Sequence, residues 1–165
     1  ADKEYPDCSQ WINDFDNLIV TRTFSKAYGL AALRIGYSLS HPDTANLLNR
    51  VRQPFNNNSL ALIAAEAALD DKEYIRKSIE INNDGMKQLT HAFDEMNLEY
   101  IPSKGNFICV DFKQPSSVIY QKLLKAGIIV RPIPDYDMPN HLRITIGLEH
   151  ENTKFIEELE KIMTK

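Results

Sequence analysis

The 165-residue sequence lacks several features that mark specialised classes of protein. It has only two cysteines, Cys8 and Cys109, and neither has a second cysteine or a histidine at metal-ligand spacing. We therefore predict two reduced thiols and no metal site. The 19 Lys and Arg residues are outnumbered by 23 Asp and Glu, and no basic block is present. This charge balance argues against a nucleic-acid partner.

Long hydrophobic runs are also absent. The most apolar stretch, Leu60 to Leu69, is interrupted by Glu66 and is about half as long as a membrane-spanning helix. The N-terminus has no signal-peptide pattern, so we expect no membrane association and a cytoplasmic location. The chain begins Ala-Asp-Lys-Glu, without an initiator methionine, and we therefore expect a piece of a longer protein.

Hydrophobic residues make up 43% of the chain and charged residues 25%, as in an ordinary globular protein. Short β-rich runs alternate with amphipathic stretches, which predicts an α/β or mixed-sheet α+β fold. We expect strands at residues 17–23, 33–39, 99–101, 107–112, 128–131 and 142–146. We expect helices at residues 42–51, after Asn58 or Ser59, and at 72–96, 118–126 and 151–165.

The densest polar cluster is the segment from Thr21 to Lys26, followed by Arg34. Strand alternation places Thr21, Thr23 and Ser25 on one face, and the chain turns where the strand ends. Hydroxyls, an amine and a guanidinium at the carboxyl end of a strand can form a phosphate site. The spacing alone is more typical of a solvated surface turn, and by themselves Arg131 and Arg143 are more typical of solvent-facing strand arginines.

Residues 22–37, RTFSKAYGLAALRIGY, closely resemble the lysine segment of the pyridoxal-phosphate aminotransferases of fold type I. The likeness continues through PFNNNSLA at 54–61, GNF at 105–107, VRP at 130–132 and LRITIG at 142–147. These matches cover nearly the whole chain and narrow the likeness to the histidinol-phosphate aminotransferase group. The resemblance implies the C-terminal part of that fold. Residues 1–59 are then a remnant of the large parallel-sheet domain, and residues 60–165 are the small α+β sandwich domain with the long linking helix.

The resemblance also assigns roles to single residues. It makes Lys26 the catalytic residue, which holds the aldehyde of pyridoxal 5′-phosphate as a Schiff base. A neighbouring positive charge on Arg34 and partial burial would favour the neutral, nucleophilic amine. The cofactor phosphate is bound by Thr23, Ser25 and Arg34. The substrate is bound by Arg143, which grips an anion, with Arg131 as its helper and Asn106 nearby.

The activity implied is transamination between histidinol phosphate and 2-oxoglutarate, in histidine biosynthesis, by a homodimer that shares its sites across the interface. Two features depart from the family pattern. Ala32 stands where a second glycine is usual. The phosphate loop, the ring-stacking aromatic residue, an Asn, a Tyr and the Asp that pairs with the pyridine nitrogen would all lie upstream of this chain. We therefore expect the chain alone to be weakly active or inactive and its full-length parent to be the enzyme.

Other functions stay open. Within the same cofactor chemistry, the chain could belong to an aromatic-amino-acid aminotransferase or to an enzyme resembling threonine-phosphate decarboxylase. From a different class, it could be a non-enzymatic α/β module that binds a small anion or another protein. A substrate panel separates the enzymes. The module predicts no spectral change with pyridoxal phosphate and no adduct at Lys26.

Overall fold

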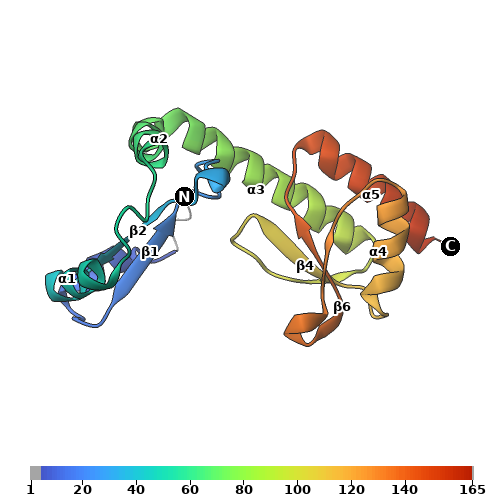
Figure 1. Ribbon diagram of the computed structural model, residues 1–165. Helices are drawn as coiled ribbons and strands as arrows, with labels where there is room; N and C mark the ends of the chain where they lie inside the picture. Colours follow the sequence, from blue (N-terminus) through green and yellow to red (C-terminus); the bar gives the residue numbers. More distant parts are fainter. Residues whose placement is uncertain (1–4, 165) are drawn as a thin grey trace. The chain divides into compact units, whose positions relative to one another are not determined.

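The structure, a computed structural model, describes residues 5–164 (Figure 1). Helices and strands are mixed along the chain, which confirms the predicted α/β class. The chain divides into two compact units, Ala1–Ile79 and Glu80–Lys165, and each is described by itself. The domain boundary expected between residues 59 and 60 stays a prediction about the family's architecture.

The first unit contains a two-stranded antiparallel sheet and two complete helices. Strand β1 (Ile19–Thr23) pairs with β2 (Gly36–Ser40), so that Thr23 lies opposite Gly36. Helix α1 (Pro42–Val51) begins with proline, whose fixed φ suits the first turn. Helix α2 (Ser59–Asp70) is capped by Asn58, whose side-chain oxygen accepts from the Ala61 N–H at 2.8 Å. Short 3-10 helices occupy Cys8–Asn13 and Ala31–Leu33.

The core of this unit lies between α2 and the segment that joins β1 to β2. Phe24 and Ile35 from that segment are buried against Ala61 and Ala65 of α2. Alanine side chains allow the helix to approach closely. The segment that carries Lys26 therefore rests on the alanine face of α2.

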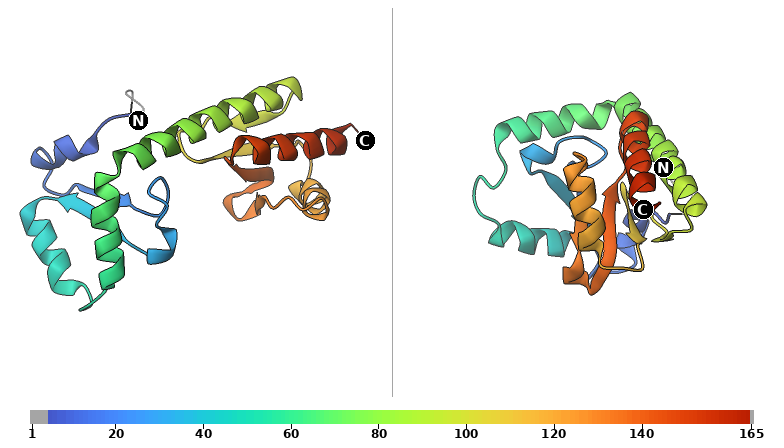
Figure 2. Two further views of the ribbon diagram at one scale, coloured as in Figure 1. Left: turned by 90° about the horizontal axis from the view of Figure 1, so that it is seen from above. Right: turned by 90° about the vertical axis from the view of Figure 1, so that its right-hand side faces the viewer.

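The second unit is a four-stranded antiparallel sheet in the order β3-β4-β6-β5. Its strands are β3 (Glu99–Ile101), β4 (Phe107–Asp111), β5 (Arg131–Ile133) and β6 (Met138–Thr145). Its helices are the C-terminal part of α3 (Lys72–Glu95), α4 (Ser116–Lys125) and α5 (Glu149–Met163). In this unit α3 and α5 lie side by side, as Figures 1 and 2 show, and the rings of Phe93 and Phe155 are 6.2 Å apart.

One face of this sheet is covered by the helices. Alternate residues Ile108 and Val110 of β4 and Leu142 and Ile144 of β6 are buried in the same core as residues of α3, α4 and α5. The intervening residues of both strands point to the other face. That second face carries the polar residues expected to contact substrate.

Of the six predicted strands only 99–101 has the predicted bounds: β1 begins at Ile19 rather than at residue 17, β4 ends at Asp111 rather than at residue 112, and three strands differ by more. The strand expected from Leu33 begins at Gly36, because Ala31–Leu33 form a 3-10 helix and Arg34 has φ 53°. The strand expected at 128–131 is β5, which begins at Arg131, where pairing with β6 starts. Strand β6 begins at Met138 rather than at residue 142. Within residues 5–164, no helix has the length and hydropathy of a membrane span.

Candidate functional site

Lys26 lies in a tight loop directly after β1. The Ser25 N–H donates to Thr23 Oγ1 at 3.1 Å, which turns the chain as it leaves the strand. The Gly29 N–H then donates to the Lys26 carbonyl at 2.8 Å, and the Leu30 N–H closes the loop on the Phe24 carbonyl at 2.9 Å. These three bonds fix the backbone on both sides of Lys26.

The loop is anchored by one aromatic residue and leaves its polar side chains accessible. Phe24 is 3% exposed, and its ring centroid lies 4.8 Å from that of Tyr28 and 5.8 Å from that of Tyr37. Lys26 is exposed, so the partial burial expected for its amine is not present in this structure. Arg34 is also exposed, and its Nη1 donates to the Ala31 carbonyl at 2.9 Å.

The charge pattern of this segment suits an anion. Between Asp16 and Asp43 the only charged side chains are Arg22, Lys26 and Arg34, all positive. The Thr23 and Ser25 hydroxyls add hydrogen-bond donors at the end of β1. Hydroxyls, an amine and a guanidinium form a donor set that fits a phosphate monoester beside an aldehyde.

A second group of basic residues lies on the uncovered sheet face of the other unit. Arg143 of β6 is paired in register with Arg131 of β5 and with Cys109 of β4. Side chains at directly opposed positions share a face, so the two arginines are neighbours. Like charges in such positions repel each other. An anion bound between them would remove that repulsion.

The Arg143 guanidinium has unused hydrogen-bonding capacity. Its Cζ lies 4.9 Å from the centre of the Phe107 ring, which supports the flat group from one side. Its Nε is buried and has no hydrogen-bond partner. Within residues 5–164, His141 Nδ1 is the only other buried side-chain nitrogen or oxygen without one. A buried unpaired donor favours a ligand acceptor.

The positive charge of Arg143 also affects Cys109, its neighbour on β4. Burial raises the pKa of the Cys109 thiol, and the positive charge of Arg143 opposes part of that rise. Cys109 is half-buried and free of disulfides, and Cys8 is also a free thiol. Among residues 5–164, no group of three or more His, Cys, Asp or Glu side chains is placed to hold a metal ion.

Asn106 lies in the turn just before β4, next to Phe107, and is exposed. Its carbonyl accepts from the Ile146 N–H at 3.0 Å, which ties the turn to the end of β6. Asn82 of α3 donates from Nδ2 to the Gly105 carbonyl at 3.1 Å. Asn82 therefore positions the turn of Asn106. In the sequence it is only a polar residue on the apolar side of the helix predicted at 72–96, which gives no sign of this role.

Asn152 is a second supporting residue that sequence reasoning missed. It is 3% exposed, and its Oδ1 accepts from the Gly147 N–H at 2.9 Å. Its Nδ2 donates to Gln88 Oε1 at 3.1 Å, which links the end of β6 to α3. A single Asn in a charged helix carries no signal of this role, because Gln88 lies 64 residues away in the sequence.

The predicted site residues thus fall into two groups. Thr23, Ser25, Lys26 and Arg34 lie together on one continuous segment of the first unit. The structure brings Arg131 and Arg143 together in the second unit, with Phe107 linking Arg143 to the turn of Asn106. Their assignment to cofactor and substrate remains a prediction.

Comparison with known proteins adds three findings. The model of the family "Aminotransferase class I and II" matches residues 3–159. The chain is 57% identical over 162 residues to histidinol-phosphate aminotransferase 2 of Pseudomonas fluorescens, which covers 98% of this chain and 44% of that relative. The chain therefore spans less than half the length of this curated relative.

Solved structures agree with the sequence comparison. Histidinol-phosphate aminotransferase of Sinorhizobium meliloti, crystallised with pyridoxal-5′-phosphate, superposes with TM-score 0.83 at 31% identity over 92% of this chain and 42% of that one. L-Threonine-O-3-phosphate decarboxylase of Porphyromonas gingivalis superposes with TM-score 0.80 at 25% identity over 95% of this chain and 50% of that one. These likenesses confirm the predicted fold class.

Proposed function

Because the chain belongs to the aminotransferase class I and II family, we propose that it forms part of a pyridoxal-phosphate-dependent aminotransferase that acts on histidinol phosphate. The observation that carries this proposal is the Lys26 loop. Three hydrogen bonds hold the backbone on both sides of Lys26, its amine is exposed, and the Thr23 and Ser25 hydroxyls and the Arg34 guanidinium belong to the same segment.

When bound, pyridoxal phosphate supplies an aldehyde and an electron-accepting ring. Lys26 Nζ is the amine that holds that aldehyde covalently. The same Lys26 Nζ would serve as the base that moves the proton at the substrate α-carbon. Thr23, Ser25 and Arg34 hold the phosphate, and thereby keep the reacting atoms within reach of Lys26.

Substrate binding is the role of the second group. Arg143 presents an unpaired buried Nε beside Arg131, and a guanidinium binds a phosphate or carboxylate through a fork of donors. We assign this pair to the phosphate of histidinol phosphate and to a carboxylate of 2-oxoglutarate as amino acceptor. Asn106, in the adjoining turn, orients the substrate.

The chain spans 44% of its P. fluorescens relative, so activity is proposed for the longer protein. We expect the 165 residues alone to turn over slowly, because the family's ring-stacking aromatic residue and its Asp partner of the pyridine nitrogen are not among them. A homodimer and a cytoplasmic location remain part of this proposal.

A decarboxylase is the second candidate, because the P. gingivalis enzyme shares the fold at 25% identity. An aromatic-amino-acid aminotransferase is a third. Both keep Lys26 as the residue that holds the cofactor; the aromatic aminotransferase differs in substrate, and the decarboxylase differs in substrate and in reaction. A non-enzymatic anion-binding module would have no enzymatic activity and would form no covalent bond at Lys26.

The test uses a chimaera, termed the extended protein, in which the upstream segment of the P. fluorescens relative precedes these 165 residues. We expect transamination of histidinol phosphate with 2-oxoglutarate, and a loss of about a thousandfold or more in kcat for Lys26→Ala. Lys125→Ala, at an exposed position of α4, is the matched control and should retain full activity. Carbon dioxide release from threonine phosphate without transamination would instead favour the decarboxylase.

A further inference from the structure

The turn that begins at Lys26 ends at a residue with unusual backbone geometry. Gly29 has φ +71° and donates its N–H to the Lys26 carbonyl at 2.8 Å. An L side chain is strained in this left-handed conformation. The Lys26 turn therefore depends on the positive φ of Gly29. Glycine adopts positive and negative φ about equally, so a further contact is needed to favour the positive value.

Tyr74 of α3 supplies such a contact. A Cβ built on Gly29 would lie 2.5 Å from the Tyr74 hydroxyl oxygen and 3.4 Å from its Cζ. The hydroxyl thus occupies the space beside the Gly29 α-carbon. Gly29 and Tyr74 belong to the same compact unit, so the contact is internal to it.

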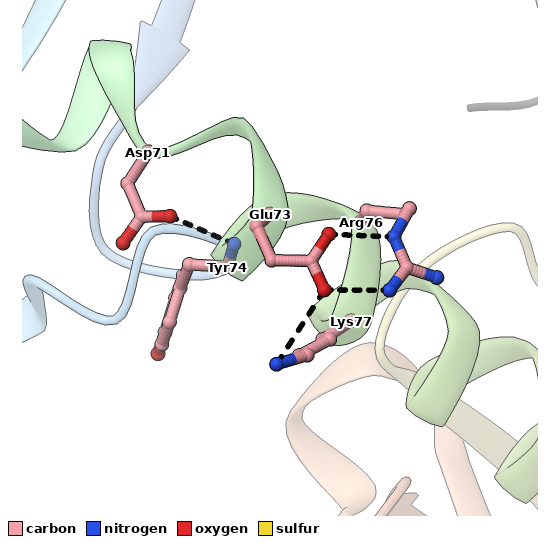
Figure 3. A network of polar contacts seen from close by, with 5 residues as sticks. All are labelled: Asp71, Glu73, Tyr74, Arg76 and Lys77. Carbon is pink, nitrogen blue, oxygen red and sulfur yellow. Dashed lines mark hydrogen bonds and ion pairs between the residues drawn. The ribbon is translucent and has the colours of Figure 1, made fainter.

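The first turn of α3 is itself firmly held (Figure 3). The Tyr74 N–H donates to Asp71 Oδ1 at 2.9 Å, which caps the helix. Glu73 accepts from Arg76 at 2.8 and 2.6 Å and pairs with Lys77 at 3.4 Å. Figure 3 shows the Tyr74 ring pointing away from these ion pairs. The cap fixes the Tyr74 backbone while leaving its ring to contact Gly29.

We propose that Tyr74 is a positioning residue for Lys26, acting through Gly29. Its hydroxyl packs against the Gly29 α-carbon and holds the Lys26–Gly29 turn closed, so that the Lys26 amine leaves the loop in a constant direction. The inference rests on the proposed function, because it takes Lys26 as the cofactor lysine. If a smaller fraction of the molecules has this turn closed, the apparent affinity for the cofactor falls in proportion to that fraction.

The first experiment measures amide hydrogen exchange on the 165-residue chain without cofactor. Tyr74→Ala should speed exchange of the Gly29 and Leu30 amides about tenfold, a cost of about 1.4 kcal/mol in closing the turn. Ile81→Ala is the control, since Ile81 lies on the same helix and is 47% exposed against 49% for Tyr74. The Ile108 amide of β4 should not change in either variant. Unchanged Gly29 and Leu30 exchange in Tyr74→Ala would overturn the proposal.

The second experiment tests the hydroxyl itself through rescue. Gly29→Ala should lower the affinity of the extended protein for pyridoxal phosphate about a hundredfold, from a clash and a strained backbone together. Tyr74→Phe leaves the ring carbon at 3.4 Å from the added Cβ, an ordinary contact. In that background Gly29→Ala should cost only about tenfold, the share due to the backbone. Absorbance titration measures both.

If Tyr74 only contributed to general stability, the costs of Gly29→Ala and Tyr74→Phe would add, and Tyr74→Phe would give no rescue. Equal costs of Gly29→Ala in both backgrounds would therefore overturn the proposal. If the unaltered extended protein shows no spectral change with pyridoxal phosphate, the proposed function fails and the Tyr74 inference with it. If it titrates normally and Tyr74→Phe gives no rescue, only the Tyr74 inference fails.

Discussion

The two units bury their apolar side chains to different degrees. Within the described residues of the second unit, a core of thirteen buried residues joins three helices to the four-stranded sheet. The corresponding core of the first unit has four, namely Phe24, Ile35, Ala61 and Ala65. Helix α1 buries none of its residues, and Leu47 and Val51 on its apolar side are 57% and 79% exposed.

The better-packed second unit is therefore the more stable part, whereas the reactive Lys26 lies in the less well-packed first unit. The second unit has a core that resembles that of a complete small domain, and it presents the arginine pair on a rigid sheet. The first unit presents Lys26 on a loop that hydrogen bonds and one aromatic anchor hold in place. Helix α2 is apolar on nearly every side, with Leu60 72% and Ile63 64% exposed, a pattern typical of helices inside a larger core.

The largest expected effect concerns two phenylalanines that differ strongly in burial. Phe93 is 0% exposed and Phe55 is 98% exposed. Phe93→Ala should lower the free energy of unfolding of the second unit by about 3–5 kcal/mol, because it leaves a cavity. Phe55→Ala should change stability by no more than about 0.5 kcal/mol. Urea unfolding followed at the Ile108 amide for Phe93→Ala and at the Leu30 amide for Phe55→Ala measures the two costs, and similar costs would contradict the contrast in burial.

An intermediate effect is expected beneath the Lys26 loop. Ala61 is 1% exposed and packs against the loop, whereas Ala67 on the same helix is exposed. Ala61→Leu should destabilise the first unit by about 1–3 kcal/mol through overpacking. Ala67→Leu should be nearly neutral, since leucine and alanine are both good helix formers. Exchange of the Leu30 amide reports the difference, and a harmless Ala61→Leu would show that α2 does not support the loop.

The smallest expected effect is electrostatic and lies in the better-packed unit. The Lys113 N–H donates to Asp111 Oδ1 at 2.8 Å, and the Lys113 ammonium lies 3.0 Å from Oδ2. These contacts hold the pKa of Asp111 below its ordinary value. The stabilisation is present above the ordinary pKa of aspartate and is lost as pH falls through the lower pKa of the folded protein.

Asp111→Asn keeps the acceptor for the Lys113 N–H and removes the charge. We expect it to cost about 0.5 kcal/mol at pH 7 and to flatten the loss of stability in acid. Urea unfolding between pH 7 and pH 3 measures this. An Asp111→Asn variant with the same acid dependence as the unaltered chain would assign that dependence to other carboxylates.

The sequence was most informative where local signals are strong. Pro42 at the first helical position and Asn58 before an alanine-rich run located α1 and the start of α2 correctly. Gly127, which follows the end of α4, has φ +79°, the left-handed conformation that favours glycine after a helix. These are effects of neighbouring residues on one another, so one short segment contains all the information required.

It was less informative where distant partners decide the structure. The apolar run before Arg131 looked like a strand, yet pairing begins only at Arg131, where β6 provides Arg143 as its partner. A non-glycine residue at φ 53°, as at Arg34, leaves no sequence pattern. The contact between Tyr74 and Gly29 joins positions 45 residues apart, and only the structure places them together.

The most direct test of the central claim is to map the cofactor adduct. The extended protein is incubated with pyridoxal phosphate, reduced with borohydride, digested and analysed by peptide mass. The account predicts one modified lysine among these 165 residues, Lys26, and loss of that adduct in Lys26→Ala. A label on any other lysine, or an unlabelled Lys26 in a protein that binds the cofactor, would contradict it.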